Sequence, residues 1–288
     1  MMKFYHKRIR NWFNLNREVQ KTNHNLTTIE RCGEVPTGFI QEMLEGKRGG
    51  LILKNVFSED KLSIMKNFRY TFLNEYIRNN NLDSFATFPD CYAFHSSKVN
   101  PDVGKEYFIA KEYFKNTRDQ INYVDSSLGF NLWDELRLQL KTIDPSWHAK
   151  QKDSPFSDMG FTPFSFRGIN NQNQVAYGAH RDMVTLDGLD SMNHNLKSSF
   201  RLPVFSVIIM LEKQKGGRLI FFNKSSDPSI PPDFNDRSYI DLEEGDLLLF
   251  VGSETYHAVE PIDGDGTRQT LGYFVNVVPE TKTLELWI

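Results

Sequence analysis

The chain has 288 residues, of which 39% are hydrophobic and 13% aromatic, with a formal net charge of −3 and a pI near 6.2. This apolar content is enough for a folded core, and the length fits one large sheet domain with helical additions. The slightly acidic balance excludes a surface built to attract polyanions, so nucleic acid is not an expected partner.

The N-terminal segment and the two cysteines indicate a cytoplasmic protein without a membrane anchor. The first ten residues are basic, but the stretch Asn11–Asn25 is mostly polar, where a secretory signal would be apolar. No stretch approaches the roughly 18 apolar residues of a membrane span. Cys32 and Cys91 have neither CxxC nor metal-ligand spacing, so we expect them to be reduced thiols.

The first part of the chain predicts a mixed start and then a strand followed by a helix. Residues 1–48 form an N-terminal arm in this interpretation, with a helix expected at Val35–Leu44. A turn and a short strand are expected within Gly49–Phe57. Ser58 then caps a helix from Leu62 to about Asn79, whose apolar spacing places it against the back of a sheet.

The middle of the chain predicts two more helices, at Tyr107–Val124 and Asn131–Lys141, because charged and apolar residues alternate at helical spacing. The segment Ile143–Asp158 contains two prolines and clusters of Ser and Asp, and it is interpreted as a linker. We therefore expect a single domain over residues 49–288, with its β-rich core at about 160–280.

In that core, short β-type runs are separated by Gly, Asn, Asp and Pro. The eight runs are Phe164–Ile169, Gln174–His180, Phe200–Leu211, Arg218–Phe222, Arg237–Leu242, Asp246–Val251, Tyr256–Ile262 and Arg268–Val278. Eight short strands predict a double-stranded β-helix, a jelly-roll sandwich whose mouth can hold a metal. The fold class is therefore mainly β with flanking helices, and a last run, Thr283–Trp287, is expected to pair with a sheet edge.

Four side chains at the ends of these runs suggest a metal centre. His180 ends the second run and Asp182 follows it, while His257 begins the seventh run and Arg268 opens the eighth. Two imidazoles and one carboxylate can occupy one face of an octahedral iron ion and leave positions open for other ligands. A guanidinium is well suited to bind a carboxylate through two parallel hydrogen bonds. The prediction depends on the strand ends meeting at one mouth of the sandwich.

From Phe164 to the C-terminus the chain resembles the Fe(II)/2-oxoglutarate-dependent oxygenase superfamily, and most of all its small hydroxylases and halogenases of secondary metabolism. The matching motifs are His180-Arg181-Asp182, Gly216-Gly217-Arg218-Leu219, Gly245-Asp246-Leu247-Leu248-Leu249-Phe250, Tyr256-His257-Ala258-Val259 and Thr267-Arg268-Gln269-Thr270.

This resemblance implies a role for each of these residues. His180, Asp182 and His257 would bind Fe(II), which 2-oxoglutarate would chelate through its 1-carboxylate and 2-keto oxygens. Arg268 would pair with the 5-carboxylate of 2-oxoglutarate, and Thr270 would add a hydroxyl. O2 would take the last metal position, as the second co-substrate.

Other residues have alternative roles at this stage. Arg167 either contacts 2-oxoglutarate or substrate, or forms a structural ion pair. Tyr177 either donates a hydrogen bond to the co-substrate or packs in the core. Met183–Ser199 is expected to be a lid over the substrate.

The resemblance also bears on the reaction. Halogenases of this superfamily have Gly or Ala in place of the carboxylate ligand, whereas this chain has Asp182. Hydroxylation of a small, amino-acid-like or natural-product substrate is therefore expected, with desaturation, epoxidation or cyclisation as variants. The competing functions are a non-redox metal protein of the cupin type and a binding module without activity.

Overall fold

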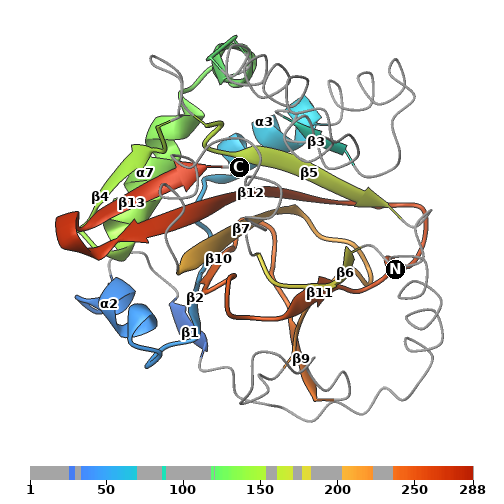
Figure 1. Ribbon diagram of the computed structural model, residues 1–288. Helices are drawn as coiled ribbons and strands as arrows, with labels where there is room; N and C mark the ends of the chain where they lie inside the picture. The colour runs from blue at the N-terminus through green and yellow to red at the C-terminus, as the bar shows by residue number, and fades with distance from the viewer. Residues whose placement is uncertain are drawn as a thin grey trace, which may run out of the picture.

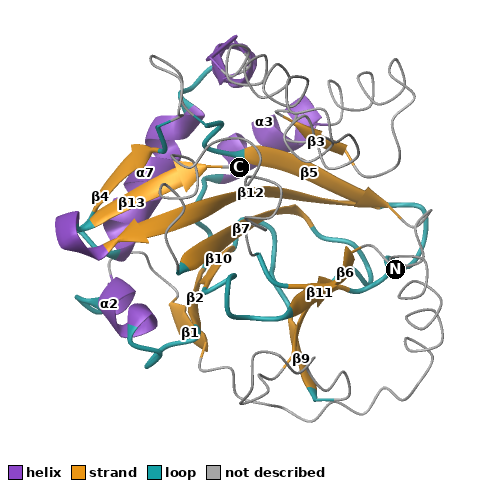
Figure 2. Ribbon diagram, in the orientation of Figure 1, coloured by secondary structure: helices purple, strands orange, loops and turns teal. Residues whose placement is uncertain are grey.

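The protein is organised around two β-sheets that face each other (Figures 1 and 2). The computed structural model describes residues 26–29, 34–69, 86–88, 118–119, 121–153, 161–170, 177–182, 203–222 and 236–287. Within these ranges one sheet has nine strands and the other has four.

The large sheet has a seven-strand path and two strands beside it. Its order is β1 (Leu26–Ile29), β2 (Gly50–Leu53), β10 (Leu247–Phe250), β7 (Val204–Glu212), β12 (Thr267–Val278), β13 (Thr283–Trp287) and β4 (His148–Gln151). β5 (Ser165–Asn170) pairs with the first half of β12, and β3 (Ala86–Phe88) pairs with β5. β12 thus pairs with three strands, β7, β13 and β5, and connects the two halves of the large sheet.

The small sheet faces the large one and carries the residues of the predicted metal centre. Its order is β6 (Tyr177–His180), β11 (His257–Val259), β8 (Leu219–Phe222) and β9 (Arg237–Ile240). These two sheets form the predicted jelly-roll architecture.

The two faces of the large sheet are lined by different residues, because side chains alternate along a strand. On β12, Leu271, Tyr273 and Val275 belong to the core between the sheet and the helices. Arg268 and Thr270 lie at alternate positions of the same strand and so point to the other face, toward the small sheet. A second apolar cluster fills that space, with members from both sheets such as Met210 and Phe221.

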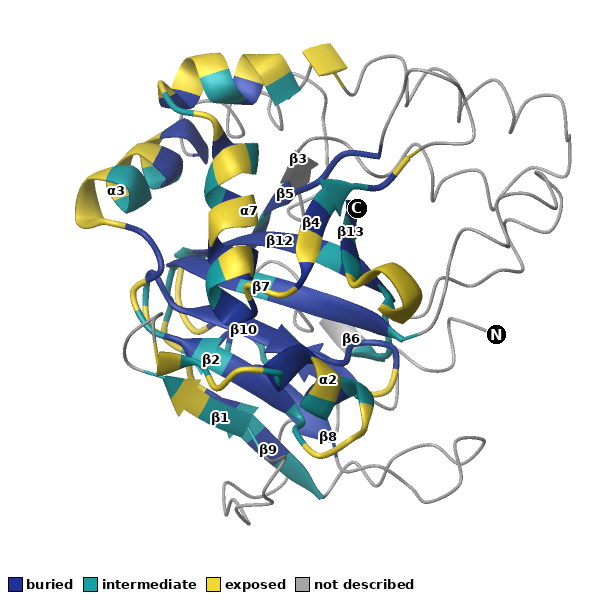
Figure 3. Ribbon diagram, turned by 90° about the vertical axis from the view of Figure 1, so that its left-hand side faces the viewer, coloured by how far each residue is buried: buried dark blue, intermediate teal, exposed yellow. Residues whose placement is uncertain are grey.

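Helices cover the outer face of the large sheet. They include α2 (Phe39–Leu44), α3 (Glu59–Phe68), α7 (Leu132–Ile143) and a helical segment at 121–128. α7 begins where the Asn131 side chain accepts a hydrogen bond from the Asp134 N–H at 2.7 Å. Its Leu132, Leu136 and Leu140 are buried at a spacing of one turn, whereas its outer face is exposed (Figure 3).

The jelly-roll prediction is confirmed, and the predicted runs contain the observed strands with small differences at their ends. The interpretation of Ile143–Asp158 as a linker is wrong, since β4 lies in this stretch and pairs in parallel with β13. β4 was hard to predict, because His148–Gln151 is mostly polar and lies at an edge of the sheet. β13 pairs with β12, which agrees with the prediction that Thr283–Trp287 is a strand added to the sheet.

The N-terminal segment contributes more to the fold than its sequence indicated. β1 pairs in parallel with β2, and α2 buries Phe39, Ile40 and Met43 in the core beneath the sheet. The predicted helix at Tyr107–Val124 lies mostly outside the described residues; those of its residues that are described, 118–119 and 121–124, are helical. Among the described helices, none combines the length and apolar character needed to cross a membrane.

Candidate metal centre

The two predicted histidine ligands lie on neighbouring strands of the small sheet. β6 and β11 are antiparallel, and their register places His180 directly opposite His257. The centroids of the two imidazole rings are 4.3 Å apart. Asp182 follows β6 and is held at the same mouth because its N–H donates to the Gly252 carbonyl at 3.0 Å.

The carboxylate of Asp182 lies next to Nε2 of both imidazole rings. Its Oδ1 is 3.5 Å from Nε2 of His180, and its Oδ2 is 3.4 Å from Nε2 of His257. The three residues each offer a ligand atom, and these atoms lie within 4.8 Å of one another. Since metal bonds to such ligands are about 2 Å long, one ion can reach all three. The structure thus brings the three predicted ligands together.

The protonation states of Asp182 and His257 suit a metal, which binds a deprotonated carboxylate and a neutral imidazole. Burial lowers the pKa of His257 to about 4, although the adjacent Asp182 opposes this shift. Burial would raise the pKa of Asp182, but the two histidines and a hydrogen bond from Ser206 outweigh it and lower the pKa. Near neutral pH, Asp182 is therefore ionised and His257 neutral.

Hydrogen bonds orient two of the three ligands. The Nδ1 of His257 lies 3.0 Å from the Thr255 carbonyl, to which it donates, so that Nε2 is left for the metal. The Ser206 hydroxyl donates to Oδ2 of Asp182 at 2.5 Å. This contact requires Gly252, because a Cβ there would lie 1.8 Å from Oγ of Ser206 and 2.7 Å from Oδ2 of Asp182.

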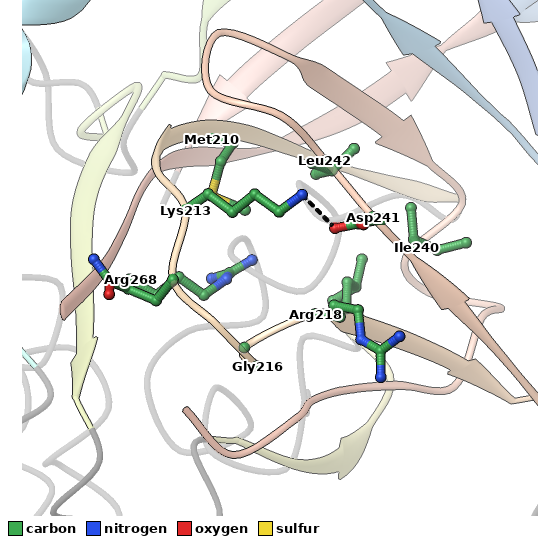
Figure 4. Close-up of a pocket in the computed structure, with 11 residues that line it drawn as sticks. Met210, Lys213, Gly216, Arg218, Ile240, Asp241, Leu242 and Arg268 are labelled. Carbon is green, nitrogen blue, oxygen red and sulfur yellow. Dashed lines mark ion pairs between the residues drawn. The ribbon is translucent and has the colours of Figure 1, made fainter. Parts of the chain in front are cut away.

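Arg268 is buried in the space between the two sheets. It is 3% exposed, and its Nε and Nη2 atoms have no hydrogen-bond partner among the residues that the structure describes. Burial, with a smaller effect of Arg167, lowers its pKa to about 10, at which the side chain remains charged in the neutral range. Figure 4 shows its guanidinium pointing into a pocket formed with Met210, the turn at Gly216 and the end of β9. A buried charge without a partner is costly, so this geometry suits an anionic ligand.

The remaining predicted site residues lie on the strands around this space. Thr270 is buried and projects from the same face of β12 as Arg268. Arg167, on β5, is paired with Thr270 and is partly exposed. The backbone of Tyr177 pairs with Val259, but its side chain and the predicted lid Met183–Ser199 lie outside the described residues.

Two residues that help to build the centre were not predicted from the sequence. Ser206 is one of the few polar residues in the apolar strand β7, and Gly252 lies in a turn after β10. An isolated serine in a strand gives no indication of its partner, because Asp182 is far away in sequence. The pairing of β7 with β10 brings Ser206 close to Gly252, and thereby to Asp182.

The fold and the three ligands define a class of protein, the jelly-roll metal proteins with two histidines and one carboxylate that are typical of non-haem iron oxygenases. Arg268, whose Nε and Nη2 have no partner among the described residues, adds a binding place for a carboxylate of a co-substrate in the space between the sheets. The residues that are present therefore fit both Fe(II) and 2-oxoglutarate.

Comparison with known families identifies the group more closely. The family described as carrier-protein-independent halogenase WelO5 matches residues 27–287. The chain therefore belongs to this family and to the Fe(II)/2-oxoglutarate-dependent oxygenase superfamily. A comparison with curated protein sequences finds no match.

Solved structures support the same fold. The chain is similar to an N-substituted L-amino acid dioxygenase from Burkholderia ambifaria AMMD, with a TM-score of 0.57 and 15% identity over 87% of this chain and 91% of that one. The structure of that dioxygenase in complex with alpha-KG matches with a TM-score of 0.53 and 14% identity, over 86% of this chain and 90% of that one. At this identity the similarity concerns the fold.

Proposed function

We propose that this protein is a hydroxylase that uses Fe(II), 2-oxoglutarate and O2 to convert a C–H bond of a small-molecule substrate into C–OH. One oxygen atom of O2 enters the product and the other enters succinate, which is released with CO2. The observation that carries the proposal is the carboxylate of Asp182, which lies within 3.5 Å of Nε2 of both histidines and accepts a hydrogen bond from Ser206.

The residues of this chain have distinct roles in the proposal. His180, Asp182 and His257 hold Fe(II), which supplies the oxidative chemistry when 2-oxoglutarate and O2 bind. Arg268 and Thr270 hold the 5-carboxylate of 2-oxoglutarate at the closed end of the site. The rings of Phe221 and Phe250 lie against His257, at centroid distances of 6.4 and 5.0 Å, and exclude water from its inner side.

Halogenation is the second candidate, because the family is described as one of halogenases. A halide that binds the metal needs the position that the carboxylate of Asp182 otherwise fills. In this chain that position holds an ionised oxygen with its own hydrogen-bond donor, Ser206. This arrangement favours hydroxylation.

Two measurements test the proposal. The protein is incubated with Fe(II), 2-oxoglutarate and O2, and succinate is measured, with a sample lacking Fe(II) as the control. Succinate that depends on Fe(II) and 2-oxoglutarate supports an oxygenase, whereas none above the control contradicts it. Chloride is then titrated into the Co(II)-loaded protein with 2-oxoglutarate under anaerobic conditions. A hydroxylase should show no chloride-dependent change in its visible spectrum, whereas a halogenase should show one.

A further inference from the structure

The second arginine of the site, Arg167, extends along the inner face of the large sheet away from Arg268. Its Cα is paired with that of Thr270, and its Cζ lies 5.6 Å from the ring centroid of Phe274. The side chain of Arg167 passes over Gly272, where the Cβ atom of any other residue would lie 3.7 Å from Cζ of Arg167. The guanidinium therefore lies near Phe274, while Arg268 belongs to the other end of the same inner face.

The charge of Arg167 is not neutralised by the part of the chain that the structure describes. Its Nε is buried without a hydrogen-bond partner, and no described carboxylate forms an ion pair with it. Its neighbour Phe274 is paired across the sheet with Ser206, whose hydroxyl donates to Asp182. Arg167 therefore lies close enough to the metal ligands to act on a molecule bound beside them.

The two arginines differ in their access to solvent. Arg268 and His257 are 3% and 4% exposed, so they lie at the closed end of the site. Arg167 and Phe274 are partly exposed, as is His180, whose side chain is 29% exposed. Among the described residues, Arg167 and Phe274 are therefore more accessible to solvent than Arg268 and His257, which suits them to contact a molecule that enters the site.

The described charged groups next to the metal position, together with the bound metal and co-substrate, sum to one excess positive charge. Fe(II), Arg167 and Arg268 carry four positive charges, whereas Asp182 and the dianion 2-oxoglutarate carry three negative charges. Since charge is costly to leave unbalanced in a poorly solvated site, the molecule that binds last is expected to bring the missing negative charge.

We propose that Arg167 binds a carboxylate of the primary substrate, and that this substrate is a small monocarboxylate whose apolar part packs on Phe274. The proposal rests on the function proposed above. The sequence analysis allowed Arg167 to contact 2-oxoglutarate or substrate or to form a structural ion pair, and the proposal assigns it to the substrate. The carboxylate anchors the substrate at the mouth, with its C–H bonds directed toward the metal.

The test uses 3-phenylpropanoate as the probe and its neutral amide, 3-phenylpropanamide, as the matched comparison. Both are titrated anaerobically into the Co(II)- and 2-oxoglutarate-loaded protein, and binding is followed by calorimetry and by the visible spectrum of Co(II). We expect the acid to bind at least about tenfold more tightly than the amide, a preference equal to about 1.4 kcal/mol. Arg167→Met should remove this preference, Arg167→Lys should retain part of it, and the affinity for 2-oxoglutarate should change less than about threefold.

The matched control is Arg237→Met, because Arg237 also stacks on an aromatic ring, that of Tyr239 at 5.5 Å, but lies on the small sheet. It should leave the preference unchanged. Equal binding of acid and amide by the unaltered protein, or binding of neither, overturns the proposal. A loss of about tenfold or more in 2-oxoglutarate affinity in Arg167→Met also overturns it and assigns Arg167 to the co-substrate. If the unaltered protein fails to bind 2-oxoglutarate at all, the failure is that of the proposed function.

Discussion

Replacement of Arg268 by Met should weaken 2-oxoglutarate binding and at the same time stabilise the ligand-free protein. Arg268 is 3% exposed, and its Nε and Nη2 lack partners within the described part of the chain, so a bound carboxylate would form a desolvated ion pair with it. Loss of one partner of such a pair costs about 2–5 kcal/mol, which corresponds to roughly 30-fold to 5000-fold weaker binding. The change should be measured by calorimetry on the Co(II)-loaded, anaerobic protein.

The opposite effect on stability follows from the same burial. In the absence of 2-oxoglutarate no carboxylate of the described residues pairs with Arg268, and burial lowers its pKa from 12.5 to about 10. A shift of this size corresponds to about 3 kcal/mol of destabilisation, which a methionine of similar volume would relieve in part. Urea denaturation of the metal-free protein should therefore show a higher free energy of unfolding for Arg268→Met.

Arg218→Met is the matched control for both measurements. Arg218 lines the same pocket as Arg268 (Figure 4), but its Nε donates to Glu260 at 2.7 Å. Its replacement should leave 2-oxoglutarate affinity unchanged and should not stabilise the protein. Unchanged 2-oxoglutarate affinity in Arg268→Met would refute the assignment of this residue to the co-substrate.

Three further predictions concern the metal ligands. Asp182→Gly should abolish hydroxylation and make the Co(II) spectrum sensitive to chloride, because the carboxylate position becomes vacant; retained hydroxylation would show that Asp182 is no ligand. Ser206→Ala should weaken Co(II) binding by about 10- to 100-fold, since it removes the donor that orients Asp182, and an unchanged affinity in a metal titration would contradict this role. The metal-free protein should lose up to about 3 kcal/mol of stability as the pH falls from 6.5 toward 4, because unfolded His257 binds a proton in this range while the folded residue, with its pKa near 4, does not. Urea denaturation at several pH values should show this slope, and His257→Leu should reduce it.

The candidate ligands could be predicted from the sequence because their spacing reflects the strand order. His180 and His257 each lie at an end of a β-type run, and a jelly roll places such ends at one mouth. The register that puts the two residues directly opposite each other was not predictable, because it depends on the pairing of β6 with β11. The same holds for Arg167 and Arg268, whose charges act on each other only because β5 pairs with β12.

The parts that sequence patterns did not predict have a common physical cause. β1 and β4 are short strands with polar or exposed positions at the ends of the large sheet, so their sequences lack the apolar alternation on which strand prediction depends. Ser206 and Gly252 have their roles through a contact between two segments that are neighbours only in the folded sheet. Long-range pairing, rather than local preference, determines all of these features.

The surroundings of Asp182 explain how one scaffold can serve two reactions. Because Gly252 has no Cβ, there is space for the Ser206 hydroxyl and for Oδ2 of Asp182 beside it. Ser206 can donate a hydrogen bond to any anion that occupies the position of Oδ2. Both features depend on the strands and turns of the large sheet and not on residue 182 itself. A carboxylate there completes the ligand set of a hydroxylase, whereas its removal leaves a small, hydrogen-bonding space next to the metal that suits a halide. In this family the choice between hydroxylation and halogenation should therefore depend mainly on the side chain at position 182, and this chain carries the aspartate.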